Sequence, residues 1–160
     1  MARIRYLFAF TVGISVLAGN GSLWATEWLP MDGRSPEAVH IAVVGADYAF
    51  TQLPSELAAG PTLIAFENRG TKRHEMSISL LKQGVTIEQI IRSEKGSVGS
   101  RAVTDSIVGL LIARPGEQSG GQLYVNLVSG RTYLVICTLK DTPNARRHSE
   151  MGMIGGFKVR

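Results

Sequence analysis

The sequence predicts an all-β domain, a β-sandwich or barrel with one short helix. Short apolar segments follow one another from Val39 to the C-terminus. Several of them alternate apolar and polar residues, as strands with one buried face do. Turn signals separate the segments at Ala59-Gly60-Pro61, Pro115-Gly116 and Ser129-Gly130. Strands of this length between such turns are typical of sandwiches and barrels.

The N-terminus has the layout of a secretory signal peptide, which we place at residues 1–25. Arg3 and Arg5 give a positive start, an apolar run of 12 residues extends from Leu7 to Ala18, and Ala25 is a candidate cleavage residue. The run is shorter than the roughly 20 residues that span a bilayer. The alternative is an uncleaved membrane anchor. We expect a periplasmic or secreted protein with no membrane segment after signal removal.

The rest of the chain is predicted to be one domain, residues 39–160, after an irregular lead-in at residues 26–38. The formal charge of +4 falls to +2 without the two arginines of the signal peptide, and no long Lys/Arg run is present. Nucleic-acid binding therefore has little support from the sequence. The single cysteine, Cys137, cannot form an intramolecular disulfide. A lone thiol in an exported protein needs burial or a ligand role.

The first half of the domain is predicted to contain four extended segments. These are Val39–Val44, Tyr48–Leu53, Thr62–Glu67 and His74–Leu80. The last one alternates well, which places His74 at the inward-facing start of a half-buried strand.

A helix is predicted at Thr86–Glu94, where Thr86 can cap the first turn and Gln89 stands three residues later. The helix belongs to an elaboration at residues 82–106, whose Gly/Ser-rich part, 96–106, is expected to be a surface excursion.

The second half contains three further apolar segments, Ile107–Ala113, Gln122–Leu127 and Tyr133–Thr138, and a final strand with Phe157 and Val159. The continuous apolar character of Tyr133–Thr138 predicts a central strand that is buried on both faces.

Four residues form a candidate metal site. Two imidazoles, a thiolate and a weak axial thioether are the ligands of blue-copper electron-transfer sites, and His74, Cys137, His148 and Met153 supply this set. Ten residues lie between Cys137 and His148 and four between His148 and Met153, so three of the four belong to one loop before the last strand. His40 has no nearby partner, and we expect it to be structural or on the surface.

Each of these residues also has a simpler interpretation. Cys137 alone is more often a small buried hydrophobe, His74 can be a core histidine with satisfied hydrogen bonds, and Met153 can fill a gap in the core. Met151 competes with Met153 but lacks a preceding glycine.

Three stretches resemble the cupredoxin family: "FENRGTKRHEM", "LYVNLVSGRTYLVIC" and "HSEMGMIGGFKV". The resemblance covers about residues 39–160. It implies a Greek-key β-sandwich or barrel and one copper ion per chain, bound by His74, Cys137, His148 and Met153. In the family the C-terminal ligand histidine faces solvent, so the resemblance implies that His148 is the electron port.

The sequence departs from the family at two places. The ten-residue segment "TLKDTPNARR" between Cys137 and His148 is longer than in small members. Glu75 stands where these members usually have Asn, whose side chain links the two ligand segments through the residue after Cys. The corresponding pair here is Glu75 and Thr138, and a carboxylate can accept a hydrogen bond from the Thr hydroxyl.

Two basic residues precede each ligand histidine: Lys72 and Arg73, and Arg146 and Arg147. They are either ordinary solvated charge or a docking surface that steers an acidic redox partner protein to the metal end. We expect a one-electron carrier rather than an enzyme. The alternatives are a copper-binding or delivery protein without rapid electron transfer and a metal-free interaction module on the same fold.

Overall fold

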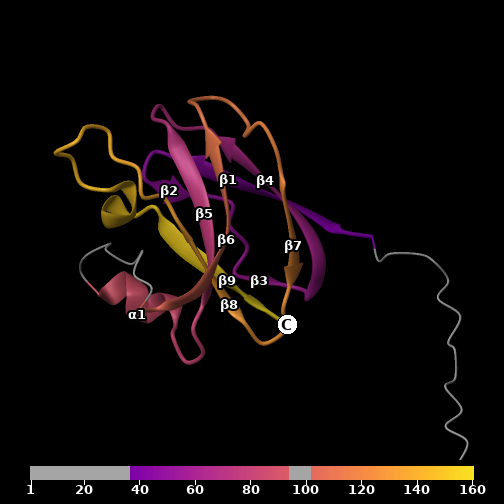
Figure 1. Cartoon of the computed structure of the whole chain (residues 1–160). Helices are drawn as coiled ribbons and strands as arrows, with labels where there is room; N and C mark the ends of the chain where they lie inside the picture. The colour runs from indigo at the N-terminus through magenta and orange to yellow at the C-terminus, as the bar shows by residue number, and fades with distance from the viewer. Residues whose placement is uncertain (1–36, 94–101) are drawn as a thin grey trace, which may run out of the picture. The chain divides into compact units, whose positions relative to one another are not determined.

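The computed structural model describes residues 37–93 and 102–160, which form two β-sheets (Figure 1). The four-stranded sheet has the order β2-β1-β4-β7 and the five-stranded sheet the order β3-β9-β8-β5-β6. This mostly β architecture confirms the predicted fold class. The predicted signal peptide, and all but the last two residues of the lead-in, lie outside the described residues.

The strands of the four-stranded sheet are β1 (Val39–Ala46), β2 (Ala49–Phe50), β4 (Gly60–Asn68) and β7 (Leu123–Leu127). Those of the five-stranded sheet are β3 (Glu56–Leu57), β5 (His74–Leu81), β6 (Thr104–Ala113), β8 (Thr132–Ile136) and β9 (Ile154–Val159). The helices are α1 (Ile87–Arg92) and the 3-10 helix η1 (His148–Met151).

The inward faces of the two sheets form the core. Buried and less buried residues alternate along β4, and its inward-facing Ile64 and Phe66 are fully buried. Met76 from β5 and Val135 from β8 belong to the same cluster of buried side chains. The period of two that predicted these strands therefore marks the face that packs between the sheets.

Strand β8 is the central strand of the five-stranded sheet, as its apolar sequence predicts. All residues from Tyr133 to Cys137 are buried, so both faces of the strand are covered. On the outer face, Leu134 and Ile136 form a second cluster with Ile90 of α1.

Helix α1 has the predicted start and an earlier end than predicted. The Gln89 backbone N–H donates to the Thr86 hydroxyl, and the Thr86 backbone N–H donates to the Gln89 side chain. This capping box satisfies two donors that the first turn leaves free. The helix ends at Arg92, and Glu94 lies outside the described residues. Among the described residues, no helix is long and apolar enough to cross a membrane.

Three differences from the sequence prediction are larger than a shift of one or two residues at the end of a strand. The expected surface excursion is a strand from Thr104 onward, because Leu81 of β5 extends far enough to pair with Thr104. Only Ala49–Phe50 of the expected segment Tyr48–Leu53 is a strand. Strand β3 was not predicted, since two residues are too few to show a period and their pairing partner, β9, is about 100 residues away.

Gly156 of β9 offers a test of the packing between β8 and β9. A Cβ at this position would overlap the Tyr133 carbonyl oxygen and the Ile87 side chain. We therefore expect Gly156→Ala to lower the free energy of unfolding by about 1–3 kcal/mol, measured by urea denaturation. Gly121→Ala is the matched control, because a Cβ there meets no atom within 4 Å. Equal stability of the two variants would contradict this packing.

Candidate metal centre

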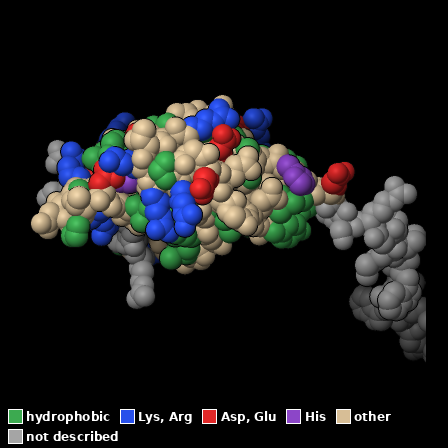
Figure 2. Space-filling model, turned by 90° about the horizontal axis from the view of Figure 1, so that it is seen from above, with side chains coloured by type: hydrophobic (Ala, Val, Ile, Leu, Met, Phe, Trp, Pro, Cys, Tyr) green, Lys and Arg blue, Asp and Glu red, His purple; other side chains and the backbone are tan. Residues whose placement is uncertain are grey.

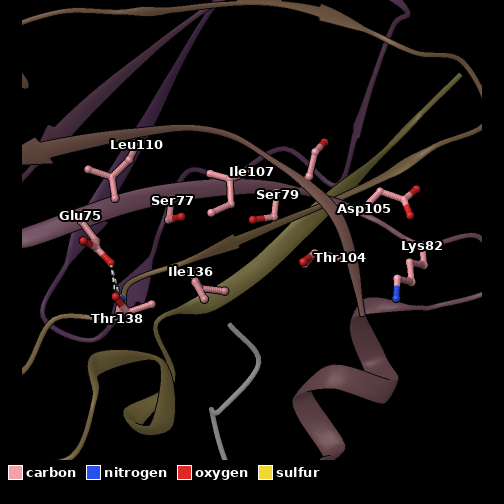
Figure 3. A pocket seen from close by; sticks show the side chains of 11 residues that line it. Glu75, Ser77, Ser79, Lys82, Thr104, Asp105, Ile107, Leu110, Ile136 and Thr138 are labelled. Atoms are coloured by element: carbon pink, nitrogen blue, oxygen red, sulfur yellow. Dashed lines mark hydrogen bonds between the residues drawn. The ribbon is translucent and has the colours of Figure 1, made fainter. Parts of the chain in front are cut away.

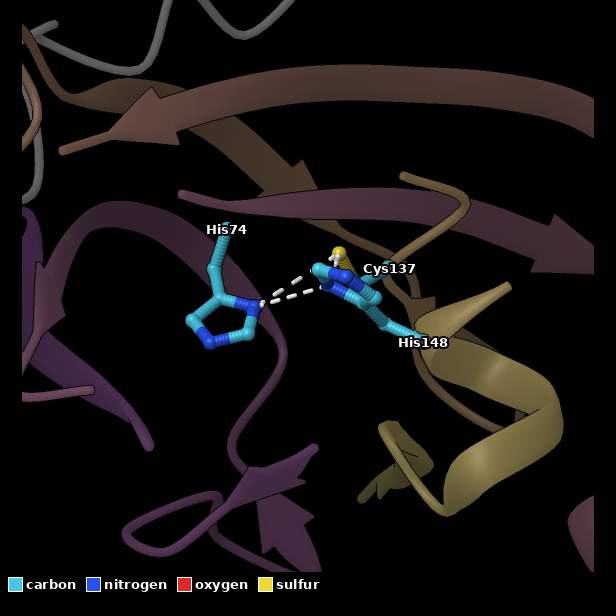
Figure 4. Close-up of side chains that lie close together, drawn as sticks. All are labelled: His74, Cys137 and His148. Atoms are coloured by element: carbon cyan, nitrogen blue, oxygen red, sulfur yellow. Dashed lines mark hydrogen bonds between the residues drawn. The ribbon is translucent and has the colours of Figure 1, made fainter. Parts of the chain in front are cut away.

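The pairing of β5 with β8 brings the first two candidate ligands together. These strands are antiparallel neighbours, with Ser77 opposite Ile136. The start of β5 and the end of β8 therefore lie at the same edge of the sheet, where His74 begins β5 and Cys137 follows β8. His148 begins η1 and joins them from the loop (Figure 4).

The donor atoms of these three side chains converge. The Nδ1 atoms of His74 and His148 are 3.0 Å apart, and Cys137 Sγ lies 3.4 Å from the His148 Nδ1 and 4.0 Å from the His74 Nδ1. A metal ion about 2.0–2.1 Å from two imidazole nitrogens and about 2.3 Å from a thiolate separates these donors by about 3.5–3.8 Å in a trigonal plane. The observed distances bracket these values, so the cluster fits one metal ion.

The site is shielded from solvent. The exposed fraction is 0% for His74 and Cys137 and 1% for His148. Burial lowers the pKa of His74 and raises the pKa of the Cys137 thiol. The His74 imidazole is therefore a neutral ligand at neutral pH, and a metal ion that binds here displaces the thiol proton.

Backbone hydrogen bonds fold the long segment between Cys137 and His148 back on itself. Lys140 and Arg147 form an antiparallel bridge. The His148 N–H donates to the Leu139 carbonyl at 2.9 Å, and the Ser149 N–H donates to the Cys137 carbonyl at 2.8 Å. The ten-residue segment is thus a hairpin whose two ends are tied together, and its length does not separate the two ligands.

Glu75 and Thr138 make the contact that the sequence predicts. Glu75 Oε1 accepts hydrogen bonds from the Thr138 backbone N–H at 2.7 Å and from the Thr138 hydroxyl at 2.6 Å. In addition, the Glu75 backbone N–H donates to Cys137 Sγ at 3.4 Å. The residues that follow two ligands are therefore joined directly, which fixes the His74 segment against the Cys137 segment.

Met153 is placed beside Cys137 by the backbone. The Cys137 N–H donates to the Met153 carbonyl at 3.1 Å, and the Met153 N–H donates to the His148 carbonyl at 2.9 Å. The Met153 side chain is fully buried and belongs to the main core cluster, whereas Met151 is partly exposed. Burial next to Cys137 favours Met153 as the thioether, and its ligation stays a prediction.

A carboxylate lies behind each imidazole. His74 Nε2 is 3.3 Å from Asp47 Oδ1, and His148 Nε2 is 3.2 Å from Asp141 Oδ1. If both Nδ1 atoms face a metal ion, each ring hydrogen is on Nε2 and is donated to a carboxylate. Such partners fix the tautomer and the orientation of ligand histidines.

The expectation that His148 faces solvent is wrong. Asp141 covers the Nε2 atom of His148. The Tyr48 ring packs edge-on against the His148 imidazole, with a distance of 5.0 Å between the ring centroids. The Tyr48 hydroxyl donates to Asp141 Oδ2 at 2.5 Å. This hydrogen bond lowers the pKa of Asp141. The family's solvent-facing arrangement does not carry over because the long loop of this chain supplies Asp141.

Sequence reasoning missed Asp47, Tyr48 and Asp141. Asp47 and Tyr48 form the turn between β1 and β2, and Asp141 lies in the loop after Cys137. Nothing in their local sequence links them to the histidines. Asp47 and Tyr48 precede His74 by 27 and 26 positions, and Asp141 precedes His148 by 7. An Asp within the loop between two candidate ligands was the one available signal.

The remaining predicted residues lie around the cluster or apart from it. Lys72, Arg73 and Arg146 are exposed and Arg147 is partly exposed, and each stands one or two positions before a buried histidine. His40 is exposed on β1 and is not part of the cluster, which agrees with a surface position.

A cavity of about 710 Å³ lies on the outer side of the five-stranded sheet (Figure 3). Glu75 and Thr138 line one end of it, and Lys82 and Asp105 line another part. None of the three clustered side chains, His74, Cys137 and His148, lines this cavity. The candidate metal centre is therefore separate from it.

The link between Glu75 and Thr138 can be tested without metal. Thr138→Val removes the hydroxyl donor from a carboxylate that is only 5% exposed and retains the backbone donor. We expect the free energy of unfolding of the metal-free protein to fall by about 1–3 kcal/mol in urea denaturation. Thr132→Val, at the start of the strand β8 that precedes Thr138, is the control, since the Thr132 hydroxyl has no hydrogen bond within the described residues. A loss no larger than that of the control would show that the hydroxyl contributes nothing.

Comparison with one solved structure, auracyanin B, agrees with the architecture. No protein-family model and no curated protein matches the chain. Among solved structures, auracyanin B is 19% identical, with a TM-score of 0.52 over 79% of this chain and 92% of that chain. Auracyanin A, a "blue" copper protein from Chloroflexus aurantiacus, is 22% identical, with a TM-score of 0.49 over 78% and 100%. A reduced auracyanin from Roseiflexus castenholzii is 18% identical, with a TM-score of 0.48 over 77% and 98%. The chain has the cupredoxin fold, as it shares the fold of auracyanin B.

Proposed function

We propose that this protein binds one copper ion at His74, Cys137 and His148, with Met153 as a weak fourth ligand, and transfers single electrons between redox partners. The observation that carries the proposal is the convergence of two imidazole nitrogens and one thiol sulfur, all within 4.8 Å of one another, in a buried site. Two imidazoles and a thiolate are the donor set of blue-copper electron-transfer sites. The cupredoxin fold supports the same assignment.

When copper is bound, it supplies the one-electron couple between Cu(II) and Cu(I). The chain holds the donors in one arrangement that suits both states. Cys137 offers the soft sulfur that favours Cu(I), while His74 and His148 offer the imidazoles that suit Cu(II). The Glu75 N–H that points at Cys137 Sγ stabilises the thiolate.

Burial and backbone anchoring favour a carrier of electrons over a carrier of copper. A protein that delivers copper needs a site that a receiving protein can reach. Here His148 is 1% exposed, and backbone hydrogen bonds tie the segment on either side of it to Cys137 and Leu139. Opening the site requires that hairpin to move. An electron needs no such opening, because it tunnels through the covering residues.

Copper addition gives the primary test. We expect the metal-free protein to bind one Cu(II) per chain and to develop an intense visible band from thiolate-to-copper charge transfer. Cys137→Ser should abolish the band, because the serine oxygen cannot replace the thiolate, whereas His40→Ala should retain it. Binding with only a weak band supports a delivery protein, and no binding supports a metal-free module. Colour that persists in Cys137→Ser contradicts the proposed site.

We further propose that Lys72, Arg73, Arg146 and Arg147 guide an acidic redox partner to the metal end. All four stand one or two positions before a buried histidine, and none forms an ion pair within the described residues. On the face seen in Figure 2, Lys and Arg side chains lie in several groups with Asp and Glu among them. Because the four basic side chains are exposed or partly exposed, we expect added salt to weaken the steering, since exposed charges are screened beyond about 10 Å at 0.1 M ionic strength.

Oxidation of the Cu(I) form of the protein by ferricyanide, a small anionic one-electron oxidant, measures this steering. We expect the rate at which Cu(I) passes its electron to ferricyanide to fall with added salt, and Arg146→Glu with Arg147→Glu to slow it by about tenfold at low salt. Lys82→Glu with Arg92→Glu is the control of equal charge, placed near the end of β5 remote from His74 and on α1. Rates that are equal in the two double variants, or indifferent to salt, would remove the docking proposal.

The N-terminal pattern supports a place of action outside the cytoplasm. We propose that residues 1–25 are removed on export, which the mass of the mature chain tests directly.

A further inference from the structure

The two-residue turn between β1 and β2, Asp47-Tyr48, has an unusual backbone. Ala46 pairs with Ala49 on either side of it. Tyr48 has φ 63°, and it is the one non-glycine residue with positive φ within residues 37–93 and 102–160. A bulky side chain rarely adopts this conformation, for which turns normally use glycine. Strain of this kind persists only where surrounding contacts hold it, and it concentrates at functional sites.

Both side chains of this turn reach toward the metal centre. Asp47 Oδ1 lies 3.3 Å from His74 Nε2. The Tyr48 hydroxyl donates to Asp141 Oδ2 at 2.5 Å, and the other oxygen of Asp141 is 3.2 Å from His148 Nε2. The Tyr48 ring also packs edge-on to both imidazoles, with centroid distances of 5.0 Å to His148 and 6.3 Å to His74.

The two carboxylates differ in how they are held. Asp47 accepts hydrogen bonds from the Thr71 backbone N–H, the Thr71 hydroxyl and the Lys72 backbone N–H. Asp141 belongs to the exposed hairpin. Within the described residues, its carboxylate has one hydrogen-bond donor besides His148, and that donor is Tyr48. The place of Asp141 therefore depends on Tyr48, whereas Asp47 has several supports.

We propose that Tyr48 is a positioning residue for the ligand His148 and acts through Asp141, an inference that rests on the proposed metal site. By holding Oδ2 of Asp141, the Tyr48 hydroxyl keeps Oδ1 opposite His148 Nε2. The ring hydrogen then stays on Nε2, and Nδ1 keeps its lone pair free and directed toward His74 and Cys137. The strained backbone of Tyr48 is what aims its hydroxyl at the loop.

A double-mutant cycle with Zn²⁺ tests this chain of contacts. Zn²⁺ needs the same imidazole tautomers as copper but has no redox chemistry. We expect Asp141→Ala to weaken Zn²⁺ binding by about 10–100-fold and Tyr48→Phe, which retains the ring, by a few-fold to about tenfold. Because Tyr48 acts through Asp141, Tyr48→Phe should cause no further loss in the Asp141→Ala background. Tyr124→Phe, at an exposed tyrosine of β7, is the matched control and should bind as the unmodified protein does.

The tautomer of the His148 imidazole in the metal-free protein is a second, independent measurement. We expect ¹⁵N NMR to find the hydrogen of His148 on Nε2, and to find a larger Nδ1–H fraction in Tyr48→Phe but not in Tyr124→Phe. Independent, additive losses of Zn²⁺ affinity, or an unchanged tautomer in Tyr48→Phe, would overturn the proposal. Neither measurement uses electron transfer. If Cu(II) gives no intense band while the cycle behaves as expected, the proposed function fails and the positioning role of Tyr48 stands.

Discussion

The antiparallel register of β5 and β8 is the constraint on which the metal centre depends. Ser77 pairs with Ile136, and continuing this register places Glu75 opposite Thr138. Through its hydrogen bonds with Thr138, the Glu75 side chain therefore extends the pairing of β5 with β8 beyond the last paired backbone residues. Because side chains alternate between the faces of a strand, a slip of one residue would turn His74 outward and Glu75 into the core. The site exists only in this register.

The buried sides of both strands protect that register. Met76 and Ile78 from β5 and Val135 from β8 are at most 1% exposed. Moving any of these side chains to the other face of its strand would remove it from the core. Emptying a core position usually lowers the free energy of unfolding by several kcal/mol. The hydrophobic core thus determines where the ligand atoms lie, although no ligand atom contributes to the pairing itself.

Much of this arrangement could be predicted from the sequence, because it depends on local patterns. The alternation in β5, the apolar run of β8 and the capping box of α1 are properties of a few neighbouring residues, and each led to the correct element. Cys137, His148 and Met153 lie close together in the sequence, so their shared loop was also visible. The two-residue strand β3 and the extension of β6 to Thr104 depend on distant pairing partners, and no local pattern indicates them.

The surroundings of the histidines could not be predicted for the same reason. Asp47 and Tyr48 come from a turn that precedes His74 by more than twenty residues, and the length of the Cys137–His148 segment did not reveal that Lys140 and Arg147 close it into a hairpin. That hairpin carries Asp141 to His148 and covers the imidazole. The family pattern implied an exposed His148, but the extra loop residues of this chain changed the exposure without moving the ligand.

The consequence for function is a site whose donor atoms are held in place by hydrogen bonds of the chain itself. Each imidazole has a carboxylate behind it, the thiol sulfur has a backbone N–H directed at it, and the two ligand segments share hydrogen bonds. A donor set held in this way suits the proposed one-electron role, because copper can then change its charge with little movement of its ligands.

X-ray absorption at the copper edge of the loaded protein gives a direct test of the proposed donor set, because it counts the atoms bound to the metal. We expect a single copper with one short bond to sulfur and two bonds to imidazole nitrogen. We also expect the sulfur contribution to disappear in Cys137→Ser. A spectrum with nitrogen and oxygen neighbours alone, or with a second copper close to the first, would contradict this donor set.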